Sequence, residues 1–355
     1  MSYSGGGGGG TNSNSSSDNN ANLKVNNITS RDEKRGAEVT GIVEAKGTYF
    51  VPPSGTTAER GSRGRGVIGG GLNPAYFNVI QYITISTLGN STDFGDLYQI
   101  VGSHGACASS TRGFFTGGSE PANSNVIQYI TISSTGNSFD FGDTTLRRTY
   151  CPSVSDTTRG VTGGGISGSL RVNVIDYFTM TTLGNSTDFG DLTQSRRRST
   201  TACSPTRGIW YGGEDGNATV NTIDYVTIAT TGDAKDFGDI ATSDTLTNTA
   251  GGASNSTRAV FGGGNTANTI TYLTIASTGD SQDFGDLTQA RGALGACSTP
   301  TRAVWMGGYT ASPFPAQVTI DYVTIATTGN AADFGDLKEV QRSCPGLSDS
   351  HGGLG

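Results

Sequence analysis

The chain has 355 residues, of which 55 are glycine, while only 15% are charged and 33% are hydrophobic. Its formal net charge of −7, with 23 Lys and Arg, argues against general binding to nucleic acid or to an anionic membrane. No apolar run reaches the length of about 18 residues that a transmembrane helix needs, so membrane insertion is not expected. Abundant Gly, Thr, Ser, Ile, Val and Tyr predict short strands joined by tight turns.

The first residues differ in composition from the rest. Residues 1–36 are rich in Gly, Ser and Asn, and we expect a flexible arm there, because such a segment buries little apolar surface. Residues 1–20 lack the basic and apolar regions of a secretion signal, so the chain is expected to fold in a cytoplasm. Residues 37–62 contain a short β-like stretch at 41–53 and are expected to form a connector or anchor.

A single unit repeats through residues 63–355. The tetrapeptide Asp-Phe-Gly-Asp occurs six times at spacings of 47 to 50 residues, beginning at Asp93, Asp140, Asp188, Asp236, Asp283 and Asp333. A tyrosine in a strand-like run precedes each copy, at Tyr82, Tyr129, Tyr177, Tyr225, Tyr272 and Tyr322. Further upstream an arginine stands five residues before a Gly-Gly pair, as Arg65, Arg112, Arg159, Arg207, Arg258 and Arg302.

Each unit predicts four short strands. In the last complete unit they begin near Cys297 and cover 302–306, 320–325 and about 333–337. Alternating apolar and polar residues at 320–325 predict a strand buried on one face. Six repeats of four strands predict an all-β, six-bladed β-propeller. One repeat position, three residues after the arginine, carries aromatic side chains that we expect to pack between neighbouring blades: Phe115, Trp210, Phe261 and Trp305.

The order of these features resembles the kelch repeat. A Gly-Gly pair ends the second strand, a tyrosine lies in the third, an aromatic residue lies in the fourth, and an arginine follows soon after, as in Leu-Thr-Gln-Ala-Arg at 287–291. The resemblance covers residues 63–355 and implies kelch-like blades. Kelch blades usually carry Trp in the fourth strand, whereas this chain has Phe in every copy, so we interpret it as a variant of that repeat.

The C-terminus predicts how the ring closes. Residues 344–353 parallel residues 151–160, which precede the second strand of another unit. The tail therefore resembles the first strand of a blade with no second strand after it. The unit that starts near Arg65 has only a degenerate first strand at 56–62. We expect the tail to supply the missing strand, which would remove two exposed sheet edges.

The repeated Asp-Phe-Gly-Asp is interpreted as a tight turn with its Phe buried and its Asp pair outside. Six copies without a partnering Lys or a His-Arg-Asp loop exclude a kinase site. Calcium binding by the Asp residues is one alternative. The favoured hypothesis is a set of charge-assisted pairs that brace the blades. It joins the arginines Arg112, Arg159, Arg207, Arg258 and Arg302 to the aspartates Asp140, Asp188, Asp236, Asp283 and Asp333.

Cysteine and histidine usage gives no sign of a metal or another cofactor. The five cysteines include no Cys-x-x-Cys, and the only histidines are His104 and His351. An odd number of cysteines argues against a complete disulfide framework. Their similar repeat positions predict small buried residues on equivalent strands. No metal, cofactor or catalytic residue is therefore assigned.

Binding residues are sought where the repeats differ, because a scaffold carries its specificity in variable loops. The loops after the Gly-Gly pairs and the connections between blades are predicted to share one face. Its candidate binding residues are Tyr76, Phe77, Glu120, Glu214, Asp215, Tyr309 and Phe314. The alternative is that these loops are only solvated. Arg147–Arg148 and Arg196–Arg198 are interpreted as a solvated basic rim.

Two stretches together suggest a source for the protein. Residues 41–53 resemble leader segments of tailed-bacteriophage structural and fibre proteins. The Tyr-Ile-Thr-Ile, Thr-Gly-Asn and Asp-Phe-Gly-Asp blade is similar to propellers in virion proteins of marine and cyanobacterial phages. The resemblance implies a non-enzymatic virion protein, bound to other virion proteins through residues 1–62, with a host surface glycan or receptor as its ligand. The alternatives are a propeller-type carbohydrate-active enzyme and an intracellular kelch-type interaction scaffold.

Overall fold

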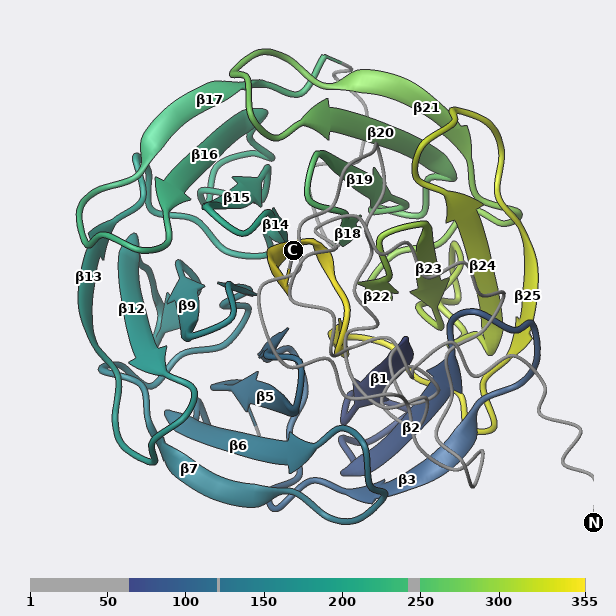
Figure 1. Ribbon diagram of the computed structural model, residues 1–355, viewed down its shortest axis with the longest axis horizontal. Helices are drawn as coiled ribbons and strands as arrows, with labels where there is room; N and C mark the ends of the chain where they lie inside the picture. The colour runs from purple at the N-terminus through teal and green to yellow at the C-terminus, as the bar shows by residue number, and fades with distance from the viewer. Residues whose placement is uncertain (1–63, 120–121, 242–249, 355) are drawn as a thin grey trace, which may run out of the picture. The chain divides into compact units, whose positions relative to one another are not determined.

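The computed structural model describes residues 64–119, 122–241 and 250–354. Together they form a ring of six four-stranded antiparallel sheets around a central axis (Figure 1). The predicted six-bladed all-β propeller is therefore confirmed. The predicted arm at 1–36 and connector at 37–62 lie outside the described residues. Within the part of the chain that is described, no helix is long and apolar enough to cross a membrane.

The two inner strands of each blade line the axis of the ring (Figure 1). The innermost strands, in blade order, are β26 (Gly346–Ser348), β4 (Gly105–Ala108), β8 (Ser153–Ser155), β14 (Thr200–Cys203), β18 (Gly251–Ser254) and β22 (Gly295–Ser298). The second strands are β1 (Arg65–Gly69), β5 (Arg112–Thr116), β9 (Arg159–Gly163), β15 (Arg207–Tyr211), β19 (Arg258–Gly262) and β23 (Arg302–Met306).

The two outer strands of each blade form its rim. The third strands are β2 (Val79–Thr84), β6 (Val126–Thr131), β12 (Val174–Thr179), β16 (Thr222–Thr227), β20 (Thr269–Thr274) and β24 (Thr319–Thr324). The outermost strands are β3 (Thr92–Asp96), β7 (Phe139–Asp143), β13 (Thr187–Asp191), β17 (Lys235–Asp239), β21 (Gln282–Asp286) and β25 (Ala332–Asp336). Blade 3 adds a short hairpin of β10 (Ile166–Ser167) and β11 (Leu170–Arg171).

The chain closes the ring with its C-terminal strand, as predicted. Strand β26 pairs antiparallel with β1, with Leu347 opposite Val67. The first blade is thus built from both ends of the propeller, in the order β26-β1-β2-β3. Strand β26 is hydrogen-bonded to the inner edge of β1. This edge of β1 is therefore not left unpaired where the two ends of the propeller meet.

The aromatic residues three places after the repeated arginine pack between blades, as predicted. Trp305 of β23 is fully buried, and its indole Nε1 donates to the carbonyl of Gly251 in the preceding blade at 2.8 Å. Trp210 lies against Gly163, where an added Cβ would come within 2.8 Å of the indole. Glycine on one blade therefore makes room for an indole on the next.

Each Asp-Phe-Gly-Asp copy lies in an outermost strand, which confirms the fourth strand predicted at about 333–337, whereas the interpretation of the motif as a tight turn is wrong. The strand carries a β-bulge, so that Asp93 pairs with Gln81 and Gly95 with Ile80 in blade 1. The phenylalanine is buried in all six copies, as expected, and the first aspartate is exposed. Gly95 has φ +145°, and a Cβ on it would lie 2.5 Å from the carbonyl oxygen of Gly136 in the next blade. The motif needs glycine because a neighbouring blade's turn crosses it there.

The predicted pairs between the repeated arginines and these aspartates are also wrong. Arg207 instead lies 4.6 Å over the ring of Tyr225 and donates to the carbonyl of Ile275 in the next blade at 2.9 Å. The other five arginines do the same, each stacking on the tyrosine of its own third strand and donating to a carbonyl of the following blade. The arginines brace the blades, but through a ring face and a carbonyl.

The turns between third and outermost strands supply a second link between blades. In each turn the residue after glycine accepts a hydrogen bond from the last backbone N–H of the preceding blade's Asp-Phe-Gly-Asp. Asn90 accepts from Asp336 in this way at 3.0 Å, and Asn185 accepts from Asp143 at the same distance. These asparagines are therefore committed to joining neighbouring blades.

Buried charge pairs provide a third link. Arg148, Arg196 and Arg291 follow an outermost strand, and each reaches an aspartate in the third strand of the next blade. The pairs are Arg148–Asp176, Arg196–Asp224 and Arg291–Asp321, all with side chains at most 1% exposed. Arg148 and Arg196 are thus core residues, and the interpretation of both as part of a solvated rim is wrong.

The same two positions carry uncharged residues at other junctions. Between blades 6 and 1 they are Gln341 and Gln81, and between blades 1 and 2 they are Val101 and Gln128. The acceptor side chain in the third strand binds the backbone after the outermost strand in both kinds of junction. Gln81 accepts from the N–H of Glu339 at 3.0 Å, just as Asp176 accepts from the N–H of Thr145 at 3.1 Å.

The five cysteines are buried and free, as predicted. Cys107, Cys203 and Cys297 lie on innermost strands, whereas Cys151 and Cys344 come just before such strands. Burial raises the pKa of all five thiols, for Cys203 to about 11. They are therefore protonated, small apolar residues of the core.

Candidate functional site

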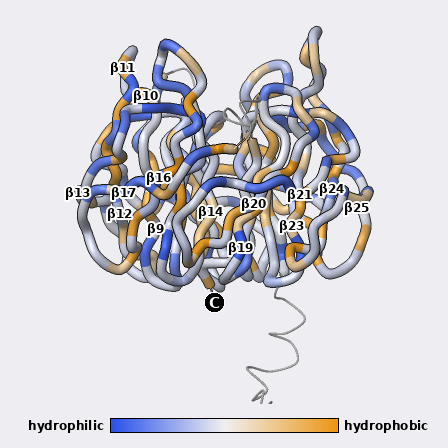
Figure 2. Tube along the Cα trace, turned by 90° about the horizontal axis from the view of Figure 1, so that it is seen from above, coloured by the Kyte–Doolittle hydropathy of each residue, from blue (hydrophilic) through white to orange (hydrophobic). Residues whose placement is uncertain are grey.

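One face of the ring gathers the segments that differ between blades, and we call it the variable-loop face. The loops after the second strands and the connections between blades lie there together, as predicted, and the structure shows that they pair with each other. The β10–β11 hairpin stands out from this face (Figure 2). Five isolated bridges join the two sets: Leu72–Arg342, Gly102–Ser119, Thr149–Ile166, Arg197–Glu214 and Gly292–Tyr309. The opposite face, which we call the repeat face, carries the five Thr-Arg turns of blades 2 to 6 and the six turns before the outermost strands.

The loop of blade 6 brings two of the predicted binding residues together in an aromatic cluster. The rings of Tyr309 and Phe314 meet edge to face with centroids 5.6 Å apart. Arg342 lies 5.6 Å over the ring of Tyr309, and its Nη1 donates to the carbonyl of Phe314 at 3.1 Å. Phe314 remains 51% exposed. The cluster therefore presents an apolar surface next to a cation.

Tyr76 and Phe77, in the loop of blade 1, are partly buried. The ring of Tyr76 packs on Gly102, where an added Cβ would come within 2.5 Å of it. Tyr76 therefore fixes its loop to the connection between blades 1 and 2. Of the remaining predicted residues, Glu120 lies outside the described residues.

Glu214 lies at the centre of an arginine cluster on blades 3 and 4. Its carboxylate is within 4 Å of the guanidinium groups of Arg171, Arg197 and Arg198, at 3.6 Å and 3.5 Å for the first and last. Arg198 and Arg197 also lie 4.6 and 5.7 Å from the ring of Tyr150. Desolvation and the two neighbouring arginines lower the pKa of Arg197. Three cations thus share this carboxylate.

Asp215, the neighbour of Glu214, has a local structural role. Its Oδ1 accepts hydrogen bonds from the backbone N–H groups of Asn217 and Ala218 at 2.8 and 3.0 Å. These two bonds hold the pKa of its carboxyl below the ordinary value. The side chain shapes the tip of the loop that carries Glu214.

A belt of left-handed residues surrounds the mouth of the central channel on the variable-loop face. Its members are non-glycine residues with φ between 54° and 59°, each two or three places before an innermost strand: Ser103, Tyr150, Arg198, Ala293 and Ser343. The sixth equivalent position, residue 249, lies outside the described residues. Such backbone is sparsely populated for non-glycine residues and costs about 1–3 kcal/mol at each place.

Backbone hydrogen bonds run along this belt from blade to blade. The N–H of Tyr150 donates to the carbonyl of Ser103 at 2.6 Å, and the N–H of Ser103 donates to that of Ser343 at 2.8 Å. Ser343 donates to Ala293 at 3.0 Å, and Arg198 donates to Tyr150 at 3.4 Å. The strained conformation is therefore held by the ring itself, which fixes the width of the mouth.

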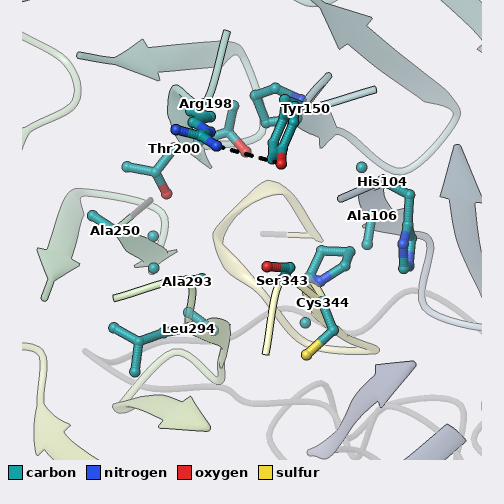
Figure 3. A pocket seen from close by; sticks show the side chains of 18 of the residues that line it. His104, Ala106, Tyr150, Arg198, Thr200, Ala250, Ala293, Leu294, Ser343 and Cys344 are labelled. Atoms are coloured by element: carbon teal, nitrogen blue, oxygen red, sulfur yellow. Dashed lines mark hydrogen bonds between the residues drawn. The ribbon is translucent and has the colours of Figure 1, made fainter. Parts of the chain in front are cut away.

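Inside the belt lies a cavity of about 140 Å³, shown in Figure 3. All five described belt residues line it, together with the first residues of the innermost strands, such as Gly105, Gly251 and Gly346. Tyr150 and Arg198 stand on one side of the cavity and are joined by a 3.4 Å hydrogen bond from Nη2 of Arg198 to the tyrosine hydroxyl (Figure 3). The other belt side chains are small, which leaves the space open.

The channel continues below this cavity as a smaller space of about 70 Å³ and ends at the C-terminal tail. His351 closes its lower end: its Nε2 lies 2.8 Å from the carbonyl of Ala108, and its Nδ1 accepts from the N–H of Gly353 at 3.1 Å. An added Cβ on Gly353 would lie 1.9 Å from the carbonyl oxygen of Ser155. Within the described part of the chain, the tail therefore closes the channel on the repeat face, and the cavity opens towards the variable-loop face.

The belt and the roles of Tyr150 and Arg198 were not found by sequence reasoning. The belt positions hold Ser, Tyr, Arg, Ala and Ser, so no glycine or shared residue type marks their left-handed backbone. Among the described residues, no three His, Cys, Asp or Glu side chains gather where they could hold a metal ion. Burial lowers the pKa of both histidines, for His104 to about 3, so they are neutral.

No protein-family model and no curated protein matches the chain. What the structure establishes is therefore the fold, a six-bladed β-propeller closed by its C-terminal strand.

Proposed function

We propose that the protein is a non-enzymatic structural and recognition protein of a tailed-phage virion. Residues 1–62 attach it to other virion proteins, and the propeller turns its variable-loop face towards a host surface glycan or receptor. The observation that carries the recognition role is the difference between the two faces. The repeat face has a Thr-Arg turn in each of blades 2 to 6 and a similar turn before the outermost strand of every blade, whereas the variable-loop face differs from blade to blade.

The variable-loop face also carries three features that are suited to binding. The aromatic cluster, the arginine cluster and the open cavity lie there, on a rigid ring that positions them. Variable loops on a fixed scaffold are the usual place for recognition, and ligand sites are concave with a few placed polar groups. This arrangement suits selective binding of a surface carbohydrate.

The virion assignment draws on two resemblances. Residues 41–53 resemble leader segments of phage structural and fibre proteins, and the blade motif is similar to kelch-like propellers of phage virion proteins. We favour binding over hydrolysis because the described residues that line the cavity include no carboxylate. Most glycoside hydrolases use two carboxylates flanking the bond they cleave.

Mass spectrometry and cryo-electron microscopy of purified particles test the virion role. We expect the protein on the particle, and we expect deletion of residues 1–60 to abolish its incorporation while the isolated propeller still folds. Deletion of the hexaglycine at 5–10 alone is the matched control and should leave incorporation unchanged. Absence of the full-length protein from particles would contradict the proposal and favour an intracellular scaffold.

A further inference from the structure

The side of the channel mouth formed by Tyr150 and Arg198 differs from the rest of the belt. Five belt residues share one strained backbone conformation, yet only these two carry large polar side chains. They come from adjacent connections, between blades 2 and 3 and between blades 3 and 4, and so lie next to each other over the cavity (Figure 3). The hydrogen-bonded backbone of the belt fixes the Cα positions of both residues. Less conformational freedom is therefore lost when a ligand binds, which favours binding.

The guanidinium of Arg198 has only weak hydrogen bonds to its neighbours. Its contacts to Glu214 and to the hydroxyl of Tyr150 are 3.5 and 3.4 Å, at the outer limit for hydrogen bonds. Its Nε is buried and has no hydrogen-bond partner among the described residues. An incoming carboxylate could make bonds of about 2.8 Å to such a group, and these are the stronger kind.

The local charge also favours an anion. Arg171 and Arg197 flank Arg198, and the three share the carboxylate of Glu214. Tyr150 accepts a hydrogen bond from Arg198 and also bonds to the side chain of Ser103, which positions its hydroxyl at the mouth of the cavity. A planar carboxylate matches the fork of the Arg198 guanidinium, which is the one arginine that lines the cavity among the described residues.

The cavity sets the size of the ligand. About 140 Å³ is close to the volume of about 150 Å³ that accepts benzene in an engineered protein cavity, so the space suits one six-membered ring whose substituents extend towards the mouth. Its lining alternates apolar groups, such as Leu294 and Pro152, with the hydroxyls of Thr200 and Ser343. A sugar ring has the same mixture of C–H faces and hydroxyl groups.

We propose that the channel mouth binds one carboxylated sugar residue, with Arg198 and Tyr150 holding its carboxylate and the cavity holding its ring. This inference rests on the proposed recognition function and names the ligand class for it. The surface glycan would be an acidic polysaccharide that presents a uronic-acid-type residue at a chain end or a branch.

Isothermal titration calorimetry of the full chain tests the site with sodium D-glucuronate, D-glucose and inorganic phosphate. We expect glucuronate to bind, glucose to bind at least about tenfold more weakly, and phosphate to give no comparable heat. Arg198→Gly removes the guanidinium and suits the left-handed backbone, so the fold is kept, and it should weaken glucuronate binding about tenfold or more. Tyr150→Phe should weaken it less.

Thr266→Gly is the matched control, because it relaxes another left-handed residue, with φ 64° in the loop after β19, that does not line the cavity, and it removes no cation. It should bind glucuronate as the wild type does. Equal affinity of Arg198→Gly, equal binding of glucose, or equal binding of phosphate would overturn the proposal. If the full-length protein is found on virions but does not bind glucuronate, only this site is refuted. Glucuronate binding by a protein absent from virions would refute only the virion role.

Discussion

Nη2 of Arg148 lies 2.7 Å from Oδ2 of Asp176, with both side chains shielded from solvent at the junction of blades 2 and 3. Arg148 also donates to the carbonyls of Val174 and Thr162 at 2.7 and 3.1 Å. The pair therefore fastens one blade to the second and third strands of the next. The Gln341 and Gln81 junction performs the same task without charge.

Replacement of one member of this pair should be costly. Asp176→Gln leaves Arg148 buried without its counter-ion, and we expect it to lower the free energy of unfolding by about 3–5 kcal/mol. The double variant Arg148→Gln with Asp176→Gln copies the junction of blades 6 and 1 and should recover most of that loss. Equilibrium denaturation of the single and double variants measures the coupling. If the loss in the double variant equals the sum of the losses in the two single variants, there is no coupling free energy between Arg148 and Asp176.

Arg207 should stabilise the ring through Tyr225 and the carbonyl of Ile275, with no help from Asp236. Arg207→Ala removes a cation–π contact and a hydrogen bond, and we expect a loss of about 1–3 kcal/mol and a lower Tm. Asp236→Asn should leave Tm within error. A similar fall for both variants would restore the Arg–Asp pairing that the structure contradicts.

Two glycines of blades 4 and 5 separate backbone strain from steric contact. Gly238 and Gly279 have nearly the same φ, +147° and +151°, but only Gly238 would place a Cβ against backbone, 2.5 Å from the carbonyl oxygen of Gly279. Gly279→Ala should cost only the strain of about 1–3 kcal/mol. Gly238→Ala should cost clearly more, since the neighbouring blade must also move. Thermal denaturation compares the two, and equal losses would contradict the role given to the motif's glycine.

His104 makes the fold sensitive to acid. Burial lowers its pKa to about 3, while the unfolded chain takes up this proton below about pH 6.5, so stability falls as pH decreases through that window. Between pH 7 and 5 this amounts to about 2 kcal/mol for one histidine. His104→Leu, which copies Leu294 of blade 6, should reduce the loss by that amount. Denaturation at pH 7 and pH 5 measures it, and an unchanged pH dependence would exclude His104 as the source.

The features that recur in every repeat could be predicted from the sequence. The features that depend on contacts between neighbouring blades could not. Six phased motifs and the likeness of residues 344–353 to 151–160 were enough for the ring and its closure. The bulge at Gly95 was taken for a turn because the crossing backbone of Gly136 belongs to another blade. The residues close to Gly95 in the sequence give no indication of that contact.

The buried pairs could have been found. Arginine eight residues after the start of the Asp-Phe-Gly-Asp motif occurs where the next third strand carries Asp, as with Arg148 and Asp176. Where that position is Val101 or Gln341, the partner is Gln. Comparison of the repeats at this spacing would have moved these arginines from the rim to the core. The belt had no such signal, since its backbone is fixed by hydrogen bonds between distant segments.

Recognition through the variable-loop face is the central claim, and binding of the full chain to an array of neutral and carboxylated saccharides tests it most directly. The matched variants are Arg198→Gly at the channel mouth and Leu183→Thr on the repeat face, where Leu183 is 65% exposed and four other blades carry Thr. We predict signal on carboxylated saccharides that Arg198→Gly loses and Leu183→Thr keeps. Binding that persists in Arg198→Gly and disappears in Leu183→Thr would place recognition on the repeat face and contradict recognition through the variable-loop face.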